Sequence, residues 1–600
     1  MPVARLKKQF QTFFFAKNGC CARSPNERRV VLAEKGGKHM SKKAILCFIT
    51  SVSFATLGTA ARGDLVIGSP NTATADPTVP RPHTRPCVVQ LFTNFRFDDF
   101  SPRLFQYIPP TGCSGPWLKV VFEGDFSVTQ GRQFDRTANV WIGGTNIYFG
   151  TTAEPSRNVS RSWHVERDLT DYSALLTMAR PGEIVLGNLV NPTYTGVIFG
   201  SATLQFYPAG DREDAPISAD LVLPLSASPI GGTVSLQTSA STLARSFNLP
   251  TNIERAFLDV YAQSQANDEF WYTCVPDDVA DELQSCGATA FREGEITIDG
   301  QPAGVAPIYP WIFTGGIDPY LWRPIPSVQT LNFVPYRVDL TPFAGLLSNG
   351  QTHEIALRVH NANHRFEATA TLLVYLDHGS TRVIGGLTRN TIGPGPMPQV
   401  REDLTRTPDR ISGTVTTRSS RVFTVAGFVN TSHGTVRTEI EQDINFWNRQ
   451  EFNITGSVYV QNIVQTTSIS SRTTIRGEGD EGDGRRMESK QLEWPLVLDF
   501  SFITNADNSS SQTTSIHQEY NSRERVTGGD RSFFREISNV VTPADTLLFD
   551  ARGALIGTQG QRNAQRYFSR DSTGACFSRR IAAADGVLTL IRDGEGCEDE

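Results

Sequence analysis

Hydrophobic and polar residues alternate along most of the chain after residue 86, in short runs rich in β-branched and aromatic side chains. The runs end at Gly, Pro, Asn or Asp, which favour turns. Examples are residues 117–122, 138–142, 203–207, 296–300 and 372–376. Short strands separated by turns are typical of β-sandwiches and jelly rolls, so the pattern predicts an all-β protein.

Two parts of the chain share one order of elements. Residues 169–176 and 340–347 are typical of short helical turns, and a predicted strand follows each, at 183–189 and 353–360. This repeat indicates two tandem jelly-roll-like β-sandwich domains, at 87–215 and 216–380. Ser/Thr-rich strands such as 423–429 and 496–502 then predict a C-terminal β-rich region at 381–600. A chain of 600 residues is too long for one core, which agrees with several domains.

The N-terminal segment has the order of a secretory signal. Met40 opens a basic stretch, an apolar run follows at 44–57, and small residues lead to a cleavage point near Ala61. We therefore expect a signal peptide at 40–61 and a secreted or periplasmic protein without stable membrane insertion. An uncleaved anchor is the alternative, although the run is short for a spanning helix. Residues 1–39 are expected to be untranslated or disordered, and 62–86, rich in Thr, Pro and Ala, an exposed linker.

Charge excludes one class of partner. The formal net charge is -6, but the first 61 residues hold 11 Lys/Arg and only 2 Asp/Glu. The remainder, with 45 basic and 60 acidic residues, has a net charge of -15. Such an acidic protein has no electrostatic reason to bind nucleic acid.

Six cysteines follow the expected cleavage point, in three close sequential pairs. An even number in an exported protein indicates disulfides, and short loops favour the pairs Cys87–Cys113, Cys274–Cys286 and Cys576–Cys597. Other pairings remain open because six cysteines allow many. A zinc site is disfavoured because no Cys-x-x-Cys spacing occurs, and we expect no metal and no cofactor.

Residues 267–272 carry two adjacent acids among aromatic residues. On a predicted strand Asp268 and Glu269 would point to opposite faces, with Trp271 beside Glu269. Carboxylates next to flat apolar rings suit a site that holds a sugar and transfers a proton. Carbohydrate-linked hydrolysis is therefore the leading hypothesis.

Two further clusters combine charge with aromatic residues. Asp135 stands beside Arg136, and a neighbouring guanidinium helps a carboxylate to stay ionised. The strand that follows contains Trp141; the alternative is a plain ion pair at the end of a strand. Residues 315–324 form a predicted loop in which Trp322 offers a stacking face and Arg323 a planar donor, although a core Trp is the common alternative.

Other chemistries have no support in the sequence. It contains no nucleophile-elbow Gly-x-Ser-x-Gly, no phosphate-binding Gly-rich loop with Lys and no His-Glu-x-x-His. His360 and His364 are four residues apart, but a structural pair is favoured over a metal site because a third ligand is missing.

Several motifs resemble one family, the acidic peptide:N-glycanases of plants, fungi and bacteria, also called peptide-N4-(N-acetyl-β-glucosaminyl)asparagine amidase A. The resemblance runs from about residue 87 into the C-terminal region. It rests on FDRTANVW (134–141), TAEP (152–155), LGNL (186–189), YTG (194–196), NDEFWY (267–272), FTGGIDP (313–319), LWRP (321–324) and TSHG (431–434).

The resemblance implies hydrolysis of the amide that joins an asparagine side chain to the first N-acetylglucosamine of an N-glycan. The glycan would leave intact and the asparagine would become aspartate. It also implies an active site in the groove between two jelly-roll-like domains, as in the more distant flavobacterial enzymes. The substrate would be a glycopeptide or glycoprotein, and we expect a monomer.

Site residues follow from the resemblance and from the clusters above. Asp135 and Glu269 would be catalytic. A further glutamate of the flavobacterial enzymes falls where this chain has Asn188. The predicted substrate-binding residues are Arg136, Trp141, Asn188, Asp268, Trp271, Trp322 and Arg323.

Two rival functions remain at this point. A non-catalytic carbohydrate-binding β-sandwich protein would use the aromatic residues without turnover. A purely structural cell-surface β-protein would neither bind nor cleave glycans. The acid motifs at 135 and 269 argue against both.

Overall fold

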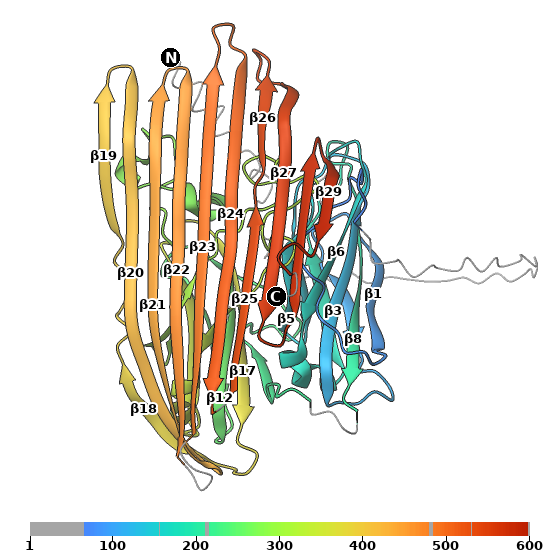
Figure 1. The fold of residues 1–600 in the computed structure, drawn as a ribbon, viewed down its shortest axis with the longest axis vertical. Coiled ribbons are helices and arrows are strands. Elements are labelled where there is room, and N and C mark those ends of the chain that lie inside the picture. The colour runs from blue at the N-terminus through green and yellow to red at the C-terminus, as the bar shows by residue number, and fades with distance from the viewer. Residues whose placement is uncertain (1–64, 155, 211–214, 479–483, 530, 598–600) are drawn as a thin grey trace, which may run out of the picture.

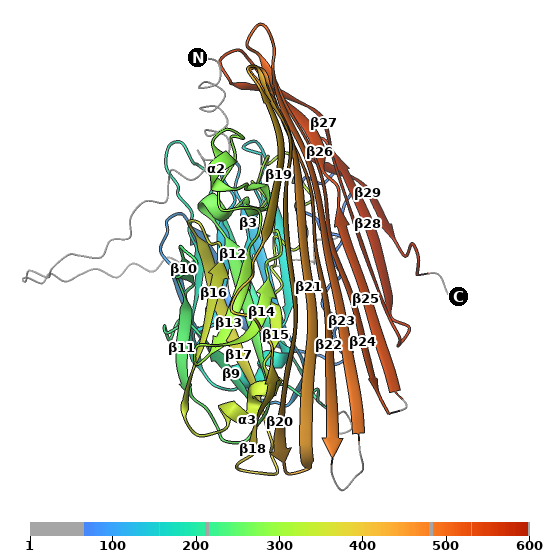
Figure 2. The ribbon, with the colours of Figure 1, turned by 90° about the vertical axis from the view of Figure 1, so that its left-hand side faces the viewer.

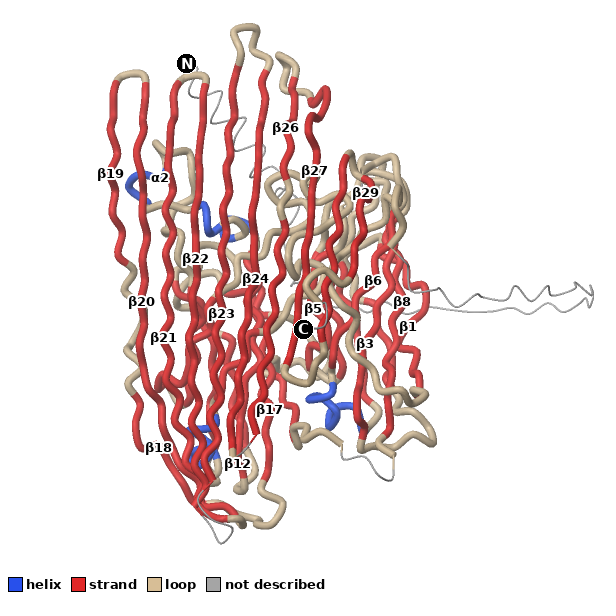
Figure 3. Tube along the Cα trace, in the orientation of Figure 1, coloured by secondary structure: helices blue, strands red, loops and turns tan. Residues whose placement is uncertain are grey.

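The computed structural model describes residues 65–154, 156–210, 215–478, 484–529 and 531–597. The predicted signal peptide and upstream extension lie outside these residues. Nearly all regular structure is antiparallel β-strand, with a few short helical turns (Figure 3). The all-β prediction is confirmed.

Two four-stranded antiparallel sheets pack face to face in the N-terminal part of the chain. Their inner faces share one core, in which Phe122 of one sheet packs on Tyr148 of the other. The first sheet, in spatial order, is β1 (Cys87–Phe97), β8 (Ile198–Pro208), β3 (Trp117–Val128) and β6 (Arg161–Asp168). The second is β2 (Arg103–Tyr107), β7 (Arg180–Leu186), β4 (Thr137–Ile142) and β5 (Thr145–Thr151).

A second sandwich follows, again with antiparallel sheets. One sheet is β10 (Val234–Leu236), β17 (Phe366–Leu376), β12 (Ile253–Ser264) and β15 (Tyr336–Asp339), and β9 (Leu221–Pro224) also pairs with β17. The other is β11 (Leu243–Asn248), β16 (Thr352–His360), β13 (Glu293–Ile298) and β14 (Gln301–Pro307). The predicted helical turns are η2 (Thr170–Thr177) in the first sandwich, and η5 (Thr341–Phe343) with α3 (Ala344–Leu347) in the second.

The C-terminal region forms one large antiparallel sheet that lies over both sandwiches as a curved layer (Figures 1 and 2). Its longest strands extend beyond the sandwiches at the upper end of Figure 1. The strands are β18 (Ile384–Asn390), β19 (Gln399–Thr407), β20 (Arg410–Thr431), β21 (Gly434–Thr455), β22 (Val458–Glu478), β23 (Gly484–Thr504), β24 (Ser510–Gly528), β25 (Arg531–Val541), β26 (Ala544–Phe549), β27 (Leu555–Asp571), β28 (Cys576–Ala584) and β29 (Val587–Asp593).

Strict alternation explains why this sheet covers the sandwiches with one face. In β23, Leu492, Trp494, Leu496 and Leu498 are buried, whereas the residues between them are more exposed. Successive side chains of a strand point to opposite faces, so a period of two produces one apolar face. That face packs into the same core as the second sandwich.

The segment predicted to be an exposed linker is partly buried instead. From residue 65 to 86 it has no strand, but Ala73 and Ala75 are buried. The backbone N–H of Ala75 donates to Gln565 of β27 at 2.7 Å, and that of Val79 to Glu166 of β6 at 2.7 Å. The prediction of exposure was wrong because the absence of periodicity does not reveal that two sheets enclose the segment.

The three disulfides join the predicted pairs, Cys87–Cys113, Cys274–Cys286 and Cys576–Cys597. One bridge lies in each of the two sandwiches and one in the C-terminal sheet.

Within the part of the chain that the structure describes, no helix is both long and apolar enough to cross a membrane.

Candidate active site

Asp135 lies at the junction of the two sandwiches, in the loop before β4. Its side chain is half-buried, and Oδ2 accepts a hydrogen bond of 2.9 Å from the backbone N–H of Gly315. Gly315 belongs to the long connection between β14 and β15, residues 308–335, which we call the crossing loop. The crossing loop pairs with β5 of the first sandwich, where Thr151 N donates to Thr330 O and Phe333 N to Phe149 O, both at 2.8 Å.

Glu154 lies directly behind Asp135. Its Oε2 accepts a bond of 3.3 Å from the backbone N–H of Asp135, and its Oε1 lies 3.9 Å from the Arg323 guanidinium. Arg323 also donates from Nε to the Glu154 carbonyl at 3.0 Å, and its guanidinium lies 4.6 Å from the Tyr320 ring centroid. Glu154 and Arg323 are almost fully buried. Glu154 therefore holds the backbone of Asp135 from the first sandwich, while Gly315 of the crossing loop holds its carboxylate.

The backbone of Arg136 is held by a hydrogen bond, whereas one nitrogen of its side chain has no partner among the described residues. Its N–H donates to Thr152 Oγ1 at 2.9 Å, and Thr314 Oγ1 donates to the Thr152 carbonyl at 2.6 Å. The buried Nε of Arg136 has no acceptor among the described residues.

A third guanidinium adds positive charge to the site. Arg161 is buried, and burial, with the nearby charge of Arg323, lowers the pKa of Arg161 to about 10. The site thus brings together acidic and cationic side chains.

Glu269 lies on a segment that the structure ties to the Asp135 loop. Gln263 and Gln265, at the end of β12, both donate to Thr137 Oγ1, at 3.2 and 3.4 Å. Thr137 is two residues after Asp135, and Glu269 is four residues after Gln265. Glu269 is half-buried.

The expected strand at 267–272 is wrong. The segment forms two short 3-10 turns, η3 (Ala266–Asp268) and η4 (Trp271–Thr273), and Ala266 has a positive φ of 54°. The Asp268 carboxylate is fully buried and pairs with Arg292 at 3.0 Å. It also accepts backbone N–H bonds from residues 363–365 at 2.8–3.2 Å. These partners lie far away in the sequence, and binding to them favours the turns over an extended strand.

The same contacts satisfy the Asp268 carboxylate inside the protein. It is fully buried and bonded to several donors, as buried carboxylates generally are. It holds the turn on which Glu269 lies.

Four other predicted binding residues are buried as well. Trp322 donates from Nε1 to Gly316 O at 3.0 Å inside the crossing loop. Asn188 donates to the carbonyls of Phe97 and Gly196, at 2.9 and 3.2 Å. The buried side chains are Trp141, Asn188, Trp271 and Trp322, each at most 3 % exposed. Arg136 is half-buried, and Arg323 borders Glu154 as described above.

Buried amide side chains of the C-terminal sheet donate hydrogen bonds to backbone carbonyls of two segments of the site, the crossing loop and the segment that follows Glu269. Gln518 donates to Pro310 O at 2.8 Å and accepts from Val328 N at 3.2 Å. Asn563 donates to Leu321 O and Ile325 O, both at 2.8 Å. In the second loop, Asn448, Gln461 and Gln450 donate to the carbonyls of Tyr272, Thr273 and Cys274 at 2.8–3.0 Å. We call these five residues the amide row.

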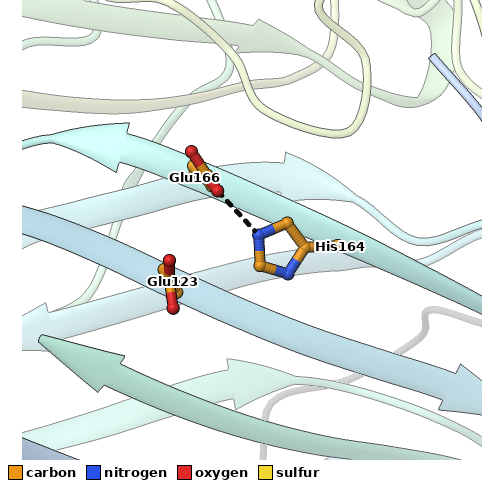
Figure 4. A group of neighbouring side chains, drawn as sticks. All are labelled: Glu123, His164 and Glu166. Atoms are coloured by element: carbon orange, nitrogen blue, oxygen red, sulfur yellow. Dashed lines mark hydrogen bonds and ion pairs between the residues drawn. The ribbon is translucent and has the colours of Figure 1, made fainter. Parts of the chain in front are cut away.

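A separate cluster on the first sandwich has the composition of a metal site (Figure 4). Ligand atoms of Glu123, His164 and Glu166 lie within 4.8 Å of one another. The Arg81 guanidinium pairs with Glu123 at 2.5 Å and with Glu166 at 2.9 Å. Arg81 therefore already supplies the positive charge that a metal ion would bring.

His164 is held in its protonated form by this cluster. Burial lowers its pKa, but hydrogen bonds to Asp125 and Glu166 outweigh burial and raise the pKa to about 9. A protonated imidazole does not ligate a metal.

Comparison with known proteins decides the family. A family model described as peptide N-acetyl-β-D-glucosaminyl asparaginase amidase A matches residues 77–378, which include both sandwiches and the site. The chain belongs to this family. A Prunus dulcis protein named peptide-N4-(N-acetyl-β-glucosaminyl)asparagine amidase A is 32% identical over 541 residues, 86% of this chain and 91% of the relative.

Two solved structures resemble this chain more weakly. PNGase F of Flavobacterium meningosepticum has 14% identity and a TM-score of 0.33, over 49% of this chain and 96% of that one. PNGF-II has 13% identity and a TM-score of 0.35, over 49% of this chain and 66% of that one. Likeness at this level carries no weight for function.

Glu154, Thr314 and Arg161 are site residues that the sequence did not single out. Glu154 stands in the TAEP motif, from which the sequence predicted no site residue. An acid that follows a buried strand and precedes Pro is only weak evidence for a functional site. Its position beside Asp135 follows only from the hydrogen bond with the Asp135 backbone, 19 residues away in the sequence.

Proposed function

We propose that this protein hydrolyses the amide between an asparagine side chain and the first N-acetylglucosamine of an N-glycopeptide or glycoprotein. The intact glycan leaves as a glycosylamine, and the peptide retains aspartate. Family membership supports the reaction class. The observation that carries the site is that Asp135 is fixed from both sandwiches yet half-buried, at the place where the crossing loop meets the first sandwich.

Asp135 is the proposed general base. It takes a proton from water as the water oxygen bonds to the amide carbon, because a positioned carboxylate can accept that proton in the transition state. Its geometry comes from two backbone contacts, since Gly315 N–H binds its carboxylate and Glu154 accepts its own N–H. We propose Glu154 as a positioning residue.

Arg136 is the proposed oxyanion donor. Negative charge develops on the amide oxygen when water adds, and a preorganised donor lowers that barrier. Arg136 is half-buried and follows Asp135 directly in the chain, so its guanidinium is the donor we assign to this role.

Glu269 is the proposed acid that protonates the leaving nitrogen. The carbon–nitrogen bond breaks as this proton is delivered, and the products are the glycosylamine and aspartate. Support comes from the contacts of Gln263 and Gln265 with Thr137, which bring the Glu269 segment beside the Asp135 loop.

We propose a support role for the five buried residues once expected to touch substrate. Asp268 and Asn188 hold loops, Trp322 braces the crossing loop, and Trp141 and Trp271 are buried in the core. Substrate contact then falls to Arg136, which is half-buried. We also propose that the protein is secreted, because three disulfides fit an oxidising compartment.

The proposal is tested by incubating the protein with an N-glycopeptide in water enriched in oxygen-18, followed by mass spectrometry. Amide hydrolysis places the label in the new aspartate and releases the whole glycan. Cleavage between the first two sugars, which leaves one sugar on asparagine, would identify a glycoside hydrolase. Glycan binding without any product would select the non-catalytic carbohydrate-binding alternative.

A further inference from the structure

One margin of the C-terminal sheet contains a gap between two short strands. β20 pairs with β21 along its whole length on one side. On the other side, β19 pairs with residues 410–418 of β20 and β18 with residues 425–430. In Figure 1, β19 and β18 lie at the upper and lower left of this margin. Among the described residues, no strand pairs with 419–424 on this side, and we call this place the edge gap.

Backbone groups of β20 point into the edge gap. The N–H of Thr424 donates to Thr391 Oγ1 at 2.8 Å, and its carbonyl accepts from Thr391 N–H at 3.0 Å, so both groups point away from β21. Alternate residues of an antiparallel strand direct their backbone groups to the same side. Ser420 and Val422 therefore point the same way as Thr424, and neither has a backbone partner there among the described residues.

The segment that connects β18 to β19, residues 391–398, does not close the edge gap. Its sequence is TIGPGPMP, and prolines lack the N–H that a sheet ladder requires. The buried Arg421 side chain donates to the carbonyl of Gly393 at 3.0 Å and pairs with Glu293 of β13, which holds the segment towards the second sandwich. A cavity of about 810 Å³ remains, lined by this segment, by β20 and by adjoining residues of β21 and β22.

Apolar side chains are exposed at the edge gap. Met397 is 89 % exposed and Val422 75 %, and both line the cavity. Trp447 of β21 is half-buried and lies opposite Arg418 in the ladder, on the face of the sheet away from the sandwiches. Exposed apolar side chains that gather at one place are typical of an interaction site.

The charge of the lining favours an acidic partner. Among the described residues that line the cavity, both charged side chains are arginines, Arg418 and Arg421. Arg421 is paired with Glu293, whereas Arg418 is exposed and makes no ion pair with a described residue. A carboxylate beside Arg418 would complement its charge.

From these observations we infer that the edge gap binds an extended acidic segment of a partner protein, which adds to β20 as a short strand. Main-chain hydrogen bonds with Ser420 and Val422 supply affinity, and contacts of alternate side chains with Arg418, Val422 and Trp447 supply selectivity. Residues 419–424 span about 20 Å at strand spacing, which suits one short strand.

Two other occupants fit less well. The N-terminal segment of this chain is basic, with 11 Lys/Arg and 2 Asp/Glu in its first 61 residues, so its charge has the wrong sign. The sheet margin of a second copy would meet β18 and β19 before it reached β20, whereas a single extended chain can enter between them. The inference does not depend on the proposed amidase activity.

The test is fluorescence anisotropy of a dye-labelled peptide of alternating valine and aspartate, titrated with the full chain. We expect saturable binding. The same peptide with every internal amide N-methylated keeps its side chains but cannot donate to β20, so it should bind about tenfold or more weakly, the equivalent of one lost hydrogen bond. A peptide with lysine in place of aspartate should also bind about tenfold more weakly because it meets Arg418 with like charge.

Two sets of variants locate the binding. Arg418→Glu changes an exposed side chain and should reverse the preference, so that the lysine peptide binds more tightly than the aspartate peptide. Val422→Pro removes an N–H that faces the edge gap, as an edge strand tolerates, and should weaken the aspartate peptide about tenfold. Val422→Thr keeps this N–H and is the matched control, with Tm measured for each variant.

Four results would overturn the inference. These are absence of binding by the aspartate peptide, equal binding of its N-methylated form, an unchanged preference in Arg418→Glu, and equal binding by Val422→Pro and Val422→Thr. Equal binding of the N-methylated peptide would identify a side-chain patch instead of strand addition.

Discussion

The carboxylate of Asp135 accepts a hydrogen bond of 2.9 Å from the backbone N–H of Gly315, a residue 180 positions later in the chain. This contact joins the first sandwich to the crossing loop of the second. A side chain held in this way depends on the positions of three layers, because the crossing loop is itself bonded to the C-terminal sheet by Gln518 and Asn563. The predictions below separate the contributions of these layers.

Glu154→Gln should lower kcat about tenfold or more and leave KM nearly unchanged. The amide keeps the shape of the side chain but loses the negative charge that faces Arg323 and accepts from the Asp135 N–H. Steady-state kinetics on an N-glycopeptide measure the effect, with the exposed Glu451→Gln as control. A change in KM alone would show that Glu154 contacts substrate rather than positions Asp135.

Asn563→Ala should reduce both activity and stability. The variant leaves the buried carbonyls of Leu321 and Ile325 without their donor, at a cost of about 1–3 kcal/mol for each group. Thermal unfolding and kcat are the measurements, and Asn445→Ala on the outer face of the sheet is the control. Full activity in Asn563→Ala would show that the amide row does not position the crossing loop.

Asp545→Asn should flatten the pH dependence of stability. Burial raises the pKa of Asp545 to about 8, and the neighbouring carboxyl of Asp318 in the crossing loop adds to the rise. Because the folded pKa lies above the ordinary value of 3.8, this contribution to stability is complete below pH 3.8 and is lost as the pH rises towards 8.

The measurement for this prediction is Tm between pH 4 and pH 8. The fall in Tm with rising pH should be smaller in Asp545→Asn than in the unmodified protein. The exposed Asp403→Asn variant should follow the unmodified protein. Parallel pH profiles for all three proteins would contradict the assigned role of Asp545.

Loss of the Cys274–Cys286 disulfide should impair the site more than loss of Cys576–Cys597. The first bridge spans 12 residues and begins directly after the turns that carry Glu269. A cross-link over a loop of about 15 residues stabilises by about 3 kcal/mol in the chain-entropy model. The comparison uses kcat and Tm of the two paired Cys→Ser variants; equal kcat in both would separate the first bridge from catalysis.

The strands were predictable because they depend on local alternation. Residues 117–122 and 496–502 lie in β3 and β23, and a period of two is visible without knowledge of the partner strand. The short turns at η2 and η5 were predictable for a similar reason, since a few residues suffice to form them.

The site was predictable only as a set of motifs. The conformation of 267–272 depends on Arg292 and on backbone groups at 363–365, so local propensity favoured the wrong element. The burial of Trp271 depends on Phe446 of the C-terminal sheet, which lies far away in the sequence. Contacts between residues far apart in the sequence have no local signature, and Glu154 was not predicted as a site residue for this reason.

The single-turnover rate of Asp135→Asn on an N-glycopeptide tests the central claim most directly. The asparagine keeps an oxygen that can accept from Gly315 N–H but cannot take a proton from water. The rate should fall by about 10²–10⁴, as loss of a general base does, while substrate affinity stays within a few-fold. A rate close to that of the unmodified protein, with the fold intact, would contradict the assignment of Asp135 as the base.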